Sequence, residues 1–355
     1  MPSQICHLLA GSRSLGGIVP AAREAFNIGC QGPDIFAHNR TTKPFALAYT
    51  RLLHRHGYGR FCAAFADRLI ACPSPVAASW LYGFVTHQAV DRALHPYIVS
   101  RCPETGHPVY PGDHVSSRVS PALYHAFLER ILDVCLLGAL DRQPVSAMDT
   151  GKAFAITDEE IETLSPPVAH ALERVYEHES SGDSLVSARV SNAFVDAREF
   201  YQITNPVGTT MKSGYGAAAV ASFAGRGASG VALLYPDEPD SSIDWLNLNN
   251  EAWPHPVSGK AVRDSVIDLF DRAVADASGC VALLNDVLAG TADPGSLEDR
   301  IGNACLSVAR EDGSIASVGY RDPFPLERAL LDEVDRRRSW FGGIRSVDPA
   351  VTELV

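Results

Sequence analysis

The sequence predicts an all-α protein. Long segments carry apolar residues at helical spacing, whereas the alternation of apolar and polar residues that is typical of half-buried strands is scarce. The chain has 355 residues and is 46% hydrophobic, which is enough to bury a large core. It contains no internal repeat and no obvious linker. We therefore expect a single helical domain over residues 1–355, in which residues 1–140 bear the candidate metal ligands and residues 141–355 form a helical scaffold.

Helix start and stop signals delimit three predicted helices in the first third of the chain. Residues 44–57 and 58–72 both have apolar residues at helical spacing, and Gly57 separates them. Residues 74–96 follow a Ser-Pro start signal. This helix is expected to end at Pro96, and its length suits a central core helix.

Two further helices are predicted from their first residues. The helix over residues 120–140 is expected to use Ser120 as its N-cap, with Pro121 in the first turn. Residues 265–290 predict another amphipathic helix. Both segments are long and periodic, so we expect them to pack into the core.

The region around residues 158–178 is expected to form two short helical pieces. A helical turn begins at Asp158 and ends near Ser165. Pro166 and Pro167 then open a second run that extends to His178, because proline is favoured in the first turn of a helix.

Three segments have the composition of loops. Residues 101–120 are rich in Pro, Gly and Ser, and residues 237–244 are polar. Residues 213–230 are rich in Gly and Ala, which is compatible with either a close-packed helix or a mobile flap.

Charge, cysteine content and the first residues narrow the class of protein. The net charge of −12 disfavours a nucleic-acid partner, because phosphate backbones are bound mainly by Lys and Arg. The eight cysteines include no Cys-x-x-Cys pair, so we expect reduced thiols and no thiolate zinc site. The start MPSQICHLLAG lacks the features of a signal peptide, and no stretch is long and apolar enough to span a bilayer. We expect a cytoplasmic protein without a stable membrane anchor.

Histidines and carboxylates with metal-ligand spacing gather in the first third of the chain. Nine of the 12 histidines precede Ala126. His87, Asp91 and His95 recur every fourth residue, which places them on one face of a helix, and His125 and Glu129 have the same spacing. Imidazole and carboxylate are ligands that zinc takes. The candidate ligands are His7, Asp34, His54, His87, Asp91, His95, His125 and Glu129.

Each candidate also has a simpler interpretation. A single histidine on a helix is more often a hydrogen-bonded residue than a ligand, and Asp91 can form salt bridges with His87 and His95 on any exposed face. Against this, the neighbouring residues of that helix are largely apolar, so these groups are expected to lie in the interior, where a buried charge needs a partner. The histidines that we regard as incidental are His38, His56, His107 and His114.

Four other residues near the candidate ligands have open or structural interpretations. Asp133 lies one turn beyond Glu129, and it either orients a ligating histidine or is a surface charge. Tyr58, Trp80 and Tyr124 are expected to be core residues, because aromatic residues at helical spacing are usually buried.

Several segments resemble the zinc-dependent phospholipase C family, particularly its bacterial members without a signal peptide. These segments are AFNIGCQGPDIF, RLLHRHGYGRF, YGFVTHQAVDRALHPYI and HAFLERILD. The distal segment DWLNLNNEAWPHPVSGKAVRDSVIDLFDRA is also similar to one that those proteins carry. The resemblance implies a multi-helix bundle of the zinc-dependent phospholipase C and single-strand nuclease type, with a metal cluster in a cleft.

The resemblance also implies how the ligands divide among two or three zinc ions. One ion is held by Asp34, His54, His87 and Asp91, and a second by His95, His125 and Glu129. A third is held by His7, with Asp91 as the bridging carboxylate. Secreted members complete the third site with an N-terminal tryptophan, and this chain has no Trp near its start. His54 is preferred to His56 because its spacing to Phe61 is closer to the family pattern.

The implied activity is hydrolysis of phosphate esters, most simply phospholipase C-like hydrolysis of a phosphodiester by a metal-bound hydroxide. Asp34 is then a candidate general base as well as a ligand. The expected partner is a phosphate-ester substrate, with phospholipid as the substrate that the family implies. The alternatives are a non-catalytic helical metal-binding protein and a related zinc nuclease or phosphatase. The shared carboxylates and the lack of cysteine ligands favour catalysis over a structural zinc site.

Overall fold

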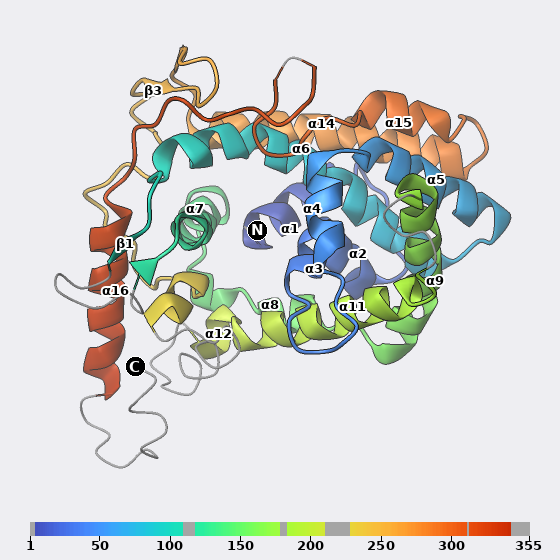
Figure 1. Cartoon of the computed structure of the whole chain (residues 1–355), viewed down its shortest axis with the longest axis horizontal. Coiled ribbons are helices and arrows are strands. Elements are labelled where there is room, and N and C mark those ends of the chain that lie inside the picture. Colours follow the sequence, from blue (N-terminus) through green and yellow to red (C-terminus); the bar gives the residue numbers. More distant parts are fainter. Residues whose placement is uncertain (1–3, 109–117, 178–182, 210–227, 311, 342–355) are drawn as a thin grey trace.

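The computed structural model of the chain describes residues 4–108, 118–177, 183–209, 228–310 and 312–341. Helices dominate it, which confirms the predicted all-α class (Figure 1). The strands in these residues form two short antiparallel pairs. Strand β1 (His107–Pro108) pairs with β2 (Arg118–Val119), and β3 (Trp253–Pro254) pairs with β4 (Ala261–Val262).

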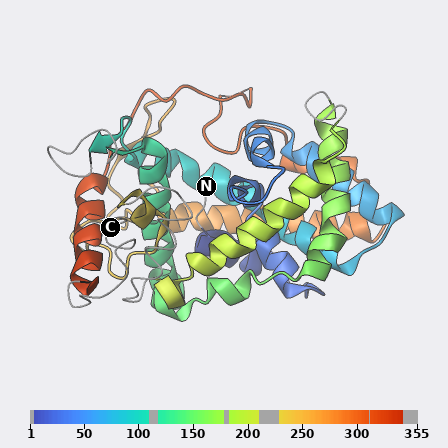
Figure 2. The same ribbon diagram turned by 60° about the horizontal axis from the view of Figure 1, so that its bottom comes forward.

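The helices that surround the centre of the molecule come mainly from the first half of the chain (Figures 1 and 2). In the first half, the α-helices are α1 (Gln4–Ser14), α2 (Arg23–Cys30), α3 (Asp34–Ala37), α4 (Leu47–Arg55), α5 (Tyr58–Ala71), α6 (Pro75–Arg101), α7 (Pro121–Asp141), α8 (Thr150–Ala153) and α9 (Asp158–Val175). In the second half, they are α11 (Val186–Ile203), α12 (Pro206–Thr209), α14 (Val266–Leu288), α15 (Gly295–Ile301) and α16 (Leu326–Phe341). Two 3₁₀ helices are η2 (Val145–Ala147) and η3 (Ala228–Leu233).

Helix α6 is the central element, and its most extensive contacts are with α2 and α14. It runs beside α14 in Figure 1. The crossing with α2 depends on glycine, because a Cβ at Gly83 would lie 2.2 Å from the carbonyl oxygen of Phe26. A Cβ at Gly29 would likewise lie 2.2 Å from the carbonyl oxygen of Trp80. Two backbones therefore meet directly, which fixes α2 and the α3 that follows it against α6.

The buried apolar side chains form two large clusters on either side of this crossing. The first joins α5, α6, α9 and α11 and contains Trp80 and Tyr58, and the second joins α6, α7, α14 and α16 and contains Tyr124. All three aromatic side chains are fully buried, which confirms that they are core residues. Among the described helices, none is both long and apolar enough to cross a membrane.

Helix α6 continues beyond its predicted end at Pro96. The helix extends to Arg101, with Pro96 in its interior. An interior proline costs about 3 kcal/mol. Tyr97 and Ile98 are buried in the second cluster, and each large apolar side chain contributes about 1.5–3 kcal/mol on burial. Tertiary packing therefore outweighs the local stop signal.

Helix α9 is another correction, because it is one continuous helix where two pieces were predicted. Pro166 and Pro167 lie inside it, and it ends at Val175; His178 lies outside the described residues. One face of the helix is buried against α5 and α11 through Ile161, Leu164, Val168 and Leu172. Burial of these four side chains contributes about 6–12 kcal/mol, which exceeds the cost of about 3 kcal/mol for each proline.

Most predicted helix starts hold. Gly57 separates α4 from α5 with a φ of +82°. The side chain of Ser74 caps α6, and Ser265 forms a capping box with Asp268 at the start of α14. Ser120 occupies the N-cap position of α7, as predicted, and its side chain makes no capping hydrogen bond.

The three predicted loops have different outcomes. Residues 237–244 contain no helix or strand, as predicted. The segment 101–120 is not entirely loop, because it contains the last residue of α6 and the strands β1 and β2. Of the segment 213–230, residues 213–227 lie outside the described part of the chain, and the remainder belongs to η3.

The close crossing of α2 and α6 at Gly83 predicts how a substitution there affects stability. We expect Gly83→Ala to lower the free energy of unfolding by roughly 1–3 kcal/mol, because the added methyl group overpacks against the α2 backbone. The matched control is Gly138→Ala in α7, where a Cβ meets nothing within 4 Å. The control should raise the free energy of unfolding by up to about 1 kcal/mol. Chemical denaturation of both variants measures the effect, and equal stability would contradict the close crossing.

Candidate metal centre

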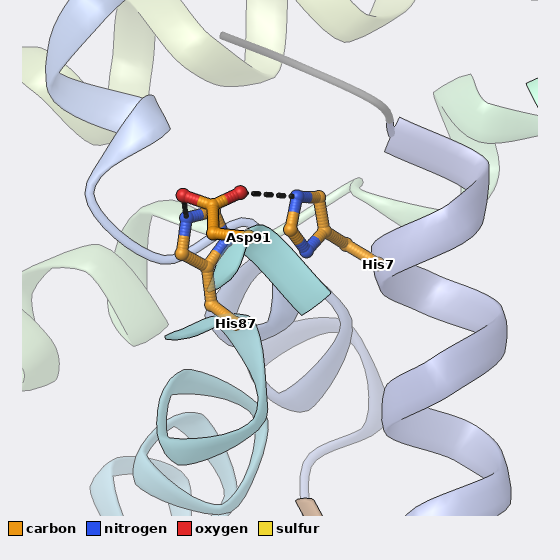
Figure 3. A group of neighbouring side chains, drawn as sticks. All are labelled: His7, His87 and Asp91. Carbon is orange, nitrogen blue, oxygen red and sulfur yellow. Dashed lines mark ion pairs between the residues drawn. The ribbon is translucent and has the colours of Figure 1, made fainter. Parts of the chain in front are cut away.

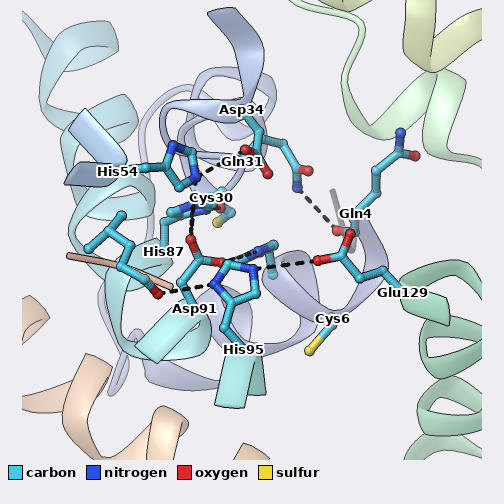
Figure 4. A network of polar contacts seen from close by, with 12 residues as sticks. Gln4, Cys6, Cys30, Gln31, Asp34, His54, His87, Asp91, His95 and Glu129 are labelled. Carbon is cyan, nitrogen blue, oxygen red and sulfur yellow. Dashed lines mark hydrogen bonds and ion pairs between the residues drawn. The ribbon is translucent and has the colours of Figure 1, made fainter. Parts of the chain in front are cut away.

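The centre is organised by one buried carboxylate, that of Asp91 on α6. Its oxygens lie 3.1 Å from His87 Nε2 and 3.7 Å from His95 Nε2, one turn away on either side. They also lie 3.4 Å from His7 Nε2 on α1 and 3.4 Å from His54 Nε2 on α4. Four imidazoles from three helices therefore surround one carboxylate (Figures 3 and 4).

The structure brings all eight sequence-predicted ligands into three groups whose ligand atoms lie within 4.8 Å of one another. The first group is His7, His87 and Asp91, the second is Asp34, His54 and His87, and the third is His95, His125 and Glu129. Figure 3 shows the first group, and Figure 4 shows that the second group and the side chains of His95 and Glu129 converge on the same interior region. His87 belongs to both the first and the second group, so its imidazole is a candidate ligand in either of them.

Backbone carbonyls orient three of the imidazoles. The Nδ1 atom of His87 lies 3.2 Å from the carbonyl oxygen of Cys30, and that of His54 lies 2.7 Å from the carbonyl oxygen of Thr50. His95 Nδ1 has a similar contact. A carbonyl oxygen only accepts, so each Nδ1 carries a hydrogen, and Nε2 is the nitrogen that faces the centre. In the neutral ring Nε2 offers a lone pair, and in the protonated ring it donates a hydrogen.

The carbonyl that orients His95 comes from a distant part of the chain. Leu306 accepts from His95 Nδ1 at 3.0 Å, and its own N–H donates to the carbonyl oxygen of His54 at 2.8 Å. Arg92 on α6 holds this segment by donating to the carbonyl oxygens of Ile301 and Ala304, at 2.5 and 3.0 Å. The backbone N–H and carbonyl of Leu306 thus link two candidate ligands, His54 and His95. Nothing in the sequence indicates this role.

Asp133 has neither of the roles that the sequence left open. It is fully buried, and its oxygens accept from the backbone N–H groups of Ile5 and Cys6 at 3.0 and 2.7 Å. It therefore neither orients a histidine directly nor lies on the surface. It ties the start of α1 to α7 through Ile5 and Cys6, which helps to position the next residue, His7.

The donor set fits a divalent cation such as zinc. Within the described part of the chain, the buried atoms of the centre that form no hydrogen bond include His54 Nε2, His87 Nε2, Asp91 Oδ2 and Glu129 Oε2. Buried polar atoms normally have a partner, and leaving one without costs about 1–3 kcal/mol. A cation held by imidazole and carboxylate satisfies these atoms together.

The three carboxylates of the centre are ionised at neutral pH because their pKa values are lowered. Burial acts to raise the pKa of Asp91, but the neighbouring imidazoles hold it well below its usual range. Burial acts on Asp34 in the same way, and nearby positive charge, including that of the His54 imidazole, holds its pKa well below the usual range. His125 lowers the pKa of Glu129 to about 2 against the effect of burial. The centre therefore carries negative charge that a cation can neutralise.

The pKa values of the imidazoles depend on burial and on these carboxylates. Burial lowers the pKa of His7, and His87 lowers it further. Burial also acts to lower the pKa of His54, but the carboxylates of Asp34 and Asp91, which lie 3.3 and 3.4 Å from its Nε2 atom, raise it to about 9. In the metal-free state His54 is therefore protonated at neutral pH, and a metal has to displace that proton.

Solvent reaches the centre at two imidazoles. The side chains of His54 and His125 are 18% and 22% exposed, whereas those of the other six candidates are at most 5% exposed. Entry to the centre is therefore on the side of α4 and the first turns of α7.

The histidines and cysteines outside the ligand set have other surroundings. His38 stacks on Phe200 with ring centroids 3.9 Å apart, and His56 packs against Tyr176 at 5.4 Å. His107 lies in β1, and His114 lies outside the described residues. All eight cysteines are free, and burial raises the pKa of the nearby Cys30 thiol to about 12. Neutral thiols are poor metal ligands.

Comparison with known proteins gives one match. The family model described as zinc dependent phospholipase C matches residues 3–173, a span that contains every residue of the three ligand groups. No curated protein and no solved structure matches the chain. With this match and the three groups of imidazole and carboxylate ligands, residues 3–173 belong to the zinc-dependent phospholipase C family.

Proposed function

We propose that the protein is a zinc-dependent hydrolase of phosphate esters that cleaves phosphodiesters in the manner of a phospholipase C. The observation that carries the proposal is the position of Asp91, whose carboxylate lies within 3.7 Å of four imidazoles. Metal ions that share a carboxylate can lie close enough to act on one phosphate group. The proposed ligands of two or three zinc ions are His7, Asp34, His54, His87, Asp91, His95, His125 and Glu129.

Zinc, when bound, polarises a phosphoryl oxygen and lowers the pKa of a coordinated water toward neutrality. The chain supplies the groups that position and deprotonate the reactants. Asp34 is buried, its carboxylate is ionised because its pKa is held low, and it lies at the group that includes the partly exposed His54. It is therefore our candidate for the general base that accepts a proton from water.

A non-catalytic metal-binding role is the main alternative. Structural zinc sites are usually closed by four protein ligands, often with thiolates. Each group here contributes three ligands, none of them a thiolate, and two of the eight imidazole and carboxylate side chains are partly exposed. Open coordination positions with solvent access support hydrolysis. A related zinc nuclease or phosphatase has the same chemistry, and the net charge of −12 disfavours a polynucleotide substrate.

The first prediction tests the centre as a whole. Asp91→Asn should reduce the zinc content per chain and lower turnover of bis(p-nitrophenyl) phosphate by more than about 100-fold, because it removes the carboxylate that four imidazoles share. The control is Asp141→Asn, an exposed carboxylate at the end of α7. Metal analysis and a chromogenic assay measure the two quantities. A zinc-loaded wild-type protein that hydrolyses neither phosphodiesters nor phosphomonoesters would favour the non-catalytic alternative.

A second prediction concerns the general base. Asp34→Asn should lower kcat for the phosphodiester by about 10²–10⁴-fold, which is the usual contribution of general base catalysis. Zinc analysis of the same sample separates loss of the base from loss of metal. Unchanged turnover with metal still bound would show that Asp34 is not the base.

A third prediction concerns pH. The pKa of His54 is about 9 in the metal-free protein, above its usual 6.5. Its contribution to the stability of that form is full below about pH 6.5 and is lost as the pH rises through about 9. Zinc needs the neutral ring, so this group alone should weaken zinc binding by about tenfold for each pH unit from 9 down to 7.

Competition with a chelator of known zinc affinity at several pH values measures this dependence. The dependence should become shallower in His54→Gln and persist in His56→Gln, because His56 is exposed and outside the ligand groups. An affinity that does not change between pH 7 and 9 in the wild-type protein would contradict the role of His54 as a ligand.

A further inference from the structure

Arg130 is a buried cation without an anionic partner. It lies on α7 directly after the candidate ligand Glu129, and it is fully buried. Its Nε, Nη1 and Nη2 atoms form no hydrogen bond within the part of the chain that the structure describes. An arginine side chain keeps its charge at all physiological pH values. Burial of such a charge without a partner is strongly unfavourable, so the site has an unmet requirement for negative charge.

A second buried arginine, Arg337, has a carboxylate partner, in contrast to Arg130. Arg337 on α16 is 2% exposed, and its Nε donates to Glu333 at 2.6 Å. It also donates to the carbonyl oxygen of Tyr235 at 2.8 Å. Arg130 contacts the same tyrosine, with its guanidinium carbon 4.4 Å from the ring centroid. Tyr235 thus contacts both arginines, and Arg337 is the one that forms an ion pair with a carboxylate.

The carboxylate nearest to Arg130 along α7 already has donors. Asp133 accepts from the backbone N–H groups of Ile5 and Cys6 and from the hydroxyl of Tyr235, the last at 3.3 Å. Two of these bonds direct its oxygens toward the start of α1, and the third directs one toward Tyr235. The hydrogen bonds that Asp133 accepts thus come from donors other than Arg130.

Two other polar atoms on the side of α3 and α11 lack partners. The hydroxyl of Tyr201 and the Nε2 atom of His38 are buried, and neither has a hydrogen-bond partner among the described residues. The two rings are 5.4 Å apart. Burial and the charge of Asp34 raise the pKa of Tyr201, and the charge of Arg130 acts in the opposite direction.

We propose that Arg130 binds a phosphate-type oxyanion beside the metal centre. A guanidinium donates two parallel hydrogen bonds to such an anion, which suits a tetrahedral phosphate better than a lysine does. The identity of this anion as the phosphoryl group of an ester substrate rests on the proposed function. The anion site itself rests on a buried guanidinium that contacts the ring of Tyr235 and forms no hydrogen bond among the described residues.

The test compares Arg130→Met with Arg68→Met in the zinc-loaded protein. Methionine keeps most of the length of the side chain and removes the charge, and Arg68 is an exposed arginine on α5. Calorimetric titration with inorganic phosphate should give a dissociation constant about 10- to 100-fold higher for Arg130→Met, because hydrogen bonds from a charged donor are lost. Arg68→Met should match the wild type. A dissociation constant for Arg130→Met within twofold of the wild type would overturn the proposal.

Thermal unfolding in phosphate-free buffer separates a ligand site from a structural one. Removal of an unpaired buried charge should leave the melting temperature of Arg130→Met equal to or above that of the wild type. A melting temperature several degrees lower would show that the fold itself needs the charge and would overturn the proposal. Arg130→Lys, which keeps the charge, should bind phosphate more tightly than Arg130→Met.

Turnover distinguishes this proposal from the proposed function. If wild-type protein binds phosphate through Arg130 but hydrolyses no phosphate ester, the anion site stands and the hydrolase proposal fails. If it hydrolyses esters and Arg130→Met has the wild-type phosphate affinity and KM, the hydrolase stands and the anion site fails. A micellar phospholipid and a soluble phosphodiester, assayed side by side, identify whether the phosphate belongs to a lipid headgroup or to a free ester.

Discussion

The attraction between the buried Asp91 carboxylate and the imidazoles around it is the interaction on which the centre depends. A carboxylate that is 4% exposed is unfavourable unless positive charge surrounds it. Here the compensating groups come from α1, α4 and two turns of α6. Each of those helices must therefore be placed correctly for the charge to be tolerated. The close crossing of α2 and α6 at Gly83 and the tie between Asp133 and α1 serve that placement.

The sequence predicted the part of the centre that lies on single helices. Residues four apart on a helix share a face whatever the rest of the fold does, so His87, Asp91 and His95 could be placed together before the structure was known. Proline signals were less reliable. Pro96, Pro166 and Pro167 were each expected to bound a helix, but all three lie within one, because burial of the neighbouring apolar residues outweighs the local penalty.

Other features could not be predicted because they have no sequence signature. The carbonyl of Leu306 contacts His95 across 211 positions of the chain, and any residue type has a carbonyl. Asp133 was singled out, but its partners are backbone N–H groups of a helix 128 and 127 positions away. The burial of Arg130 has no sequence signature either, since an arginine on a helix is usually exposed. Its burial follows from the packing of α7 against segments distant in the sequence.

The link through Leu306 has a consequence for the order of events in folding. The family match ends at residue 173, yet the ring of His95 is held by a peptide group that is synthesised far later. During translation the helices that bear the ligands are complete well before residues 301–306 leave the ribosome. Until that segment docks on Arg92, His95 lacks the acceptor that fixes its tautomer. In a nascent chain the ring of His95 therefore gains its carbonyl acceptor only after this distant segment has been synthesised.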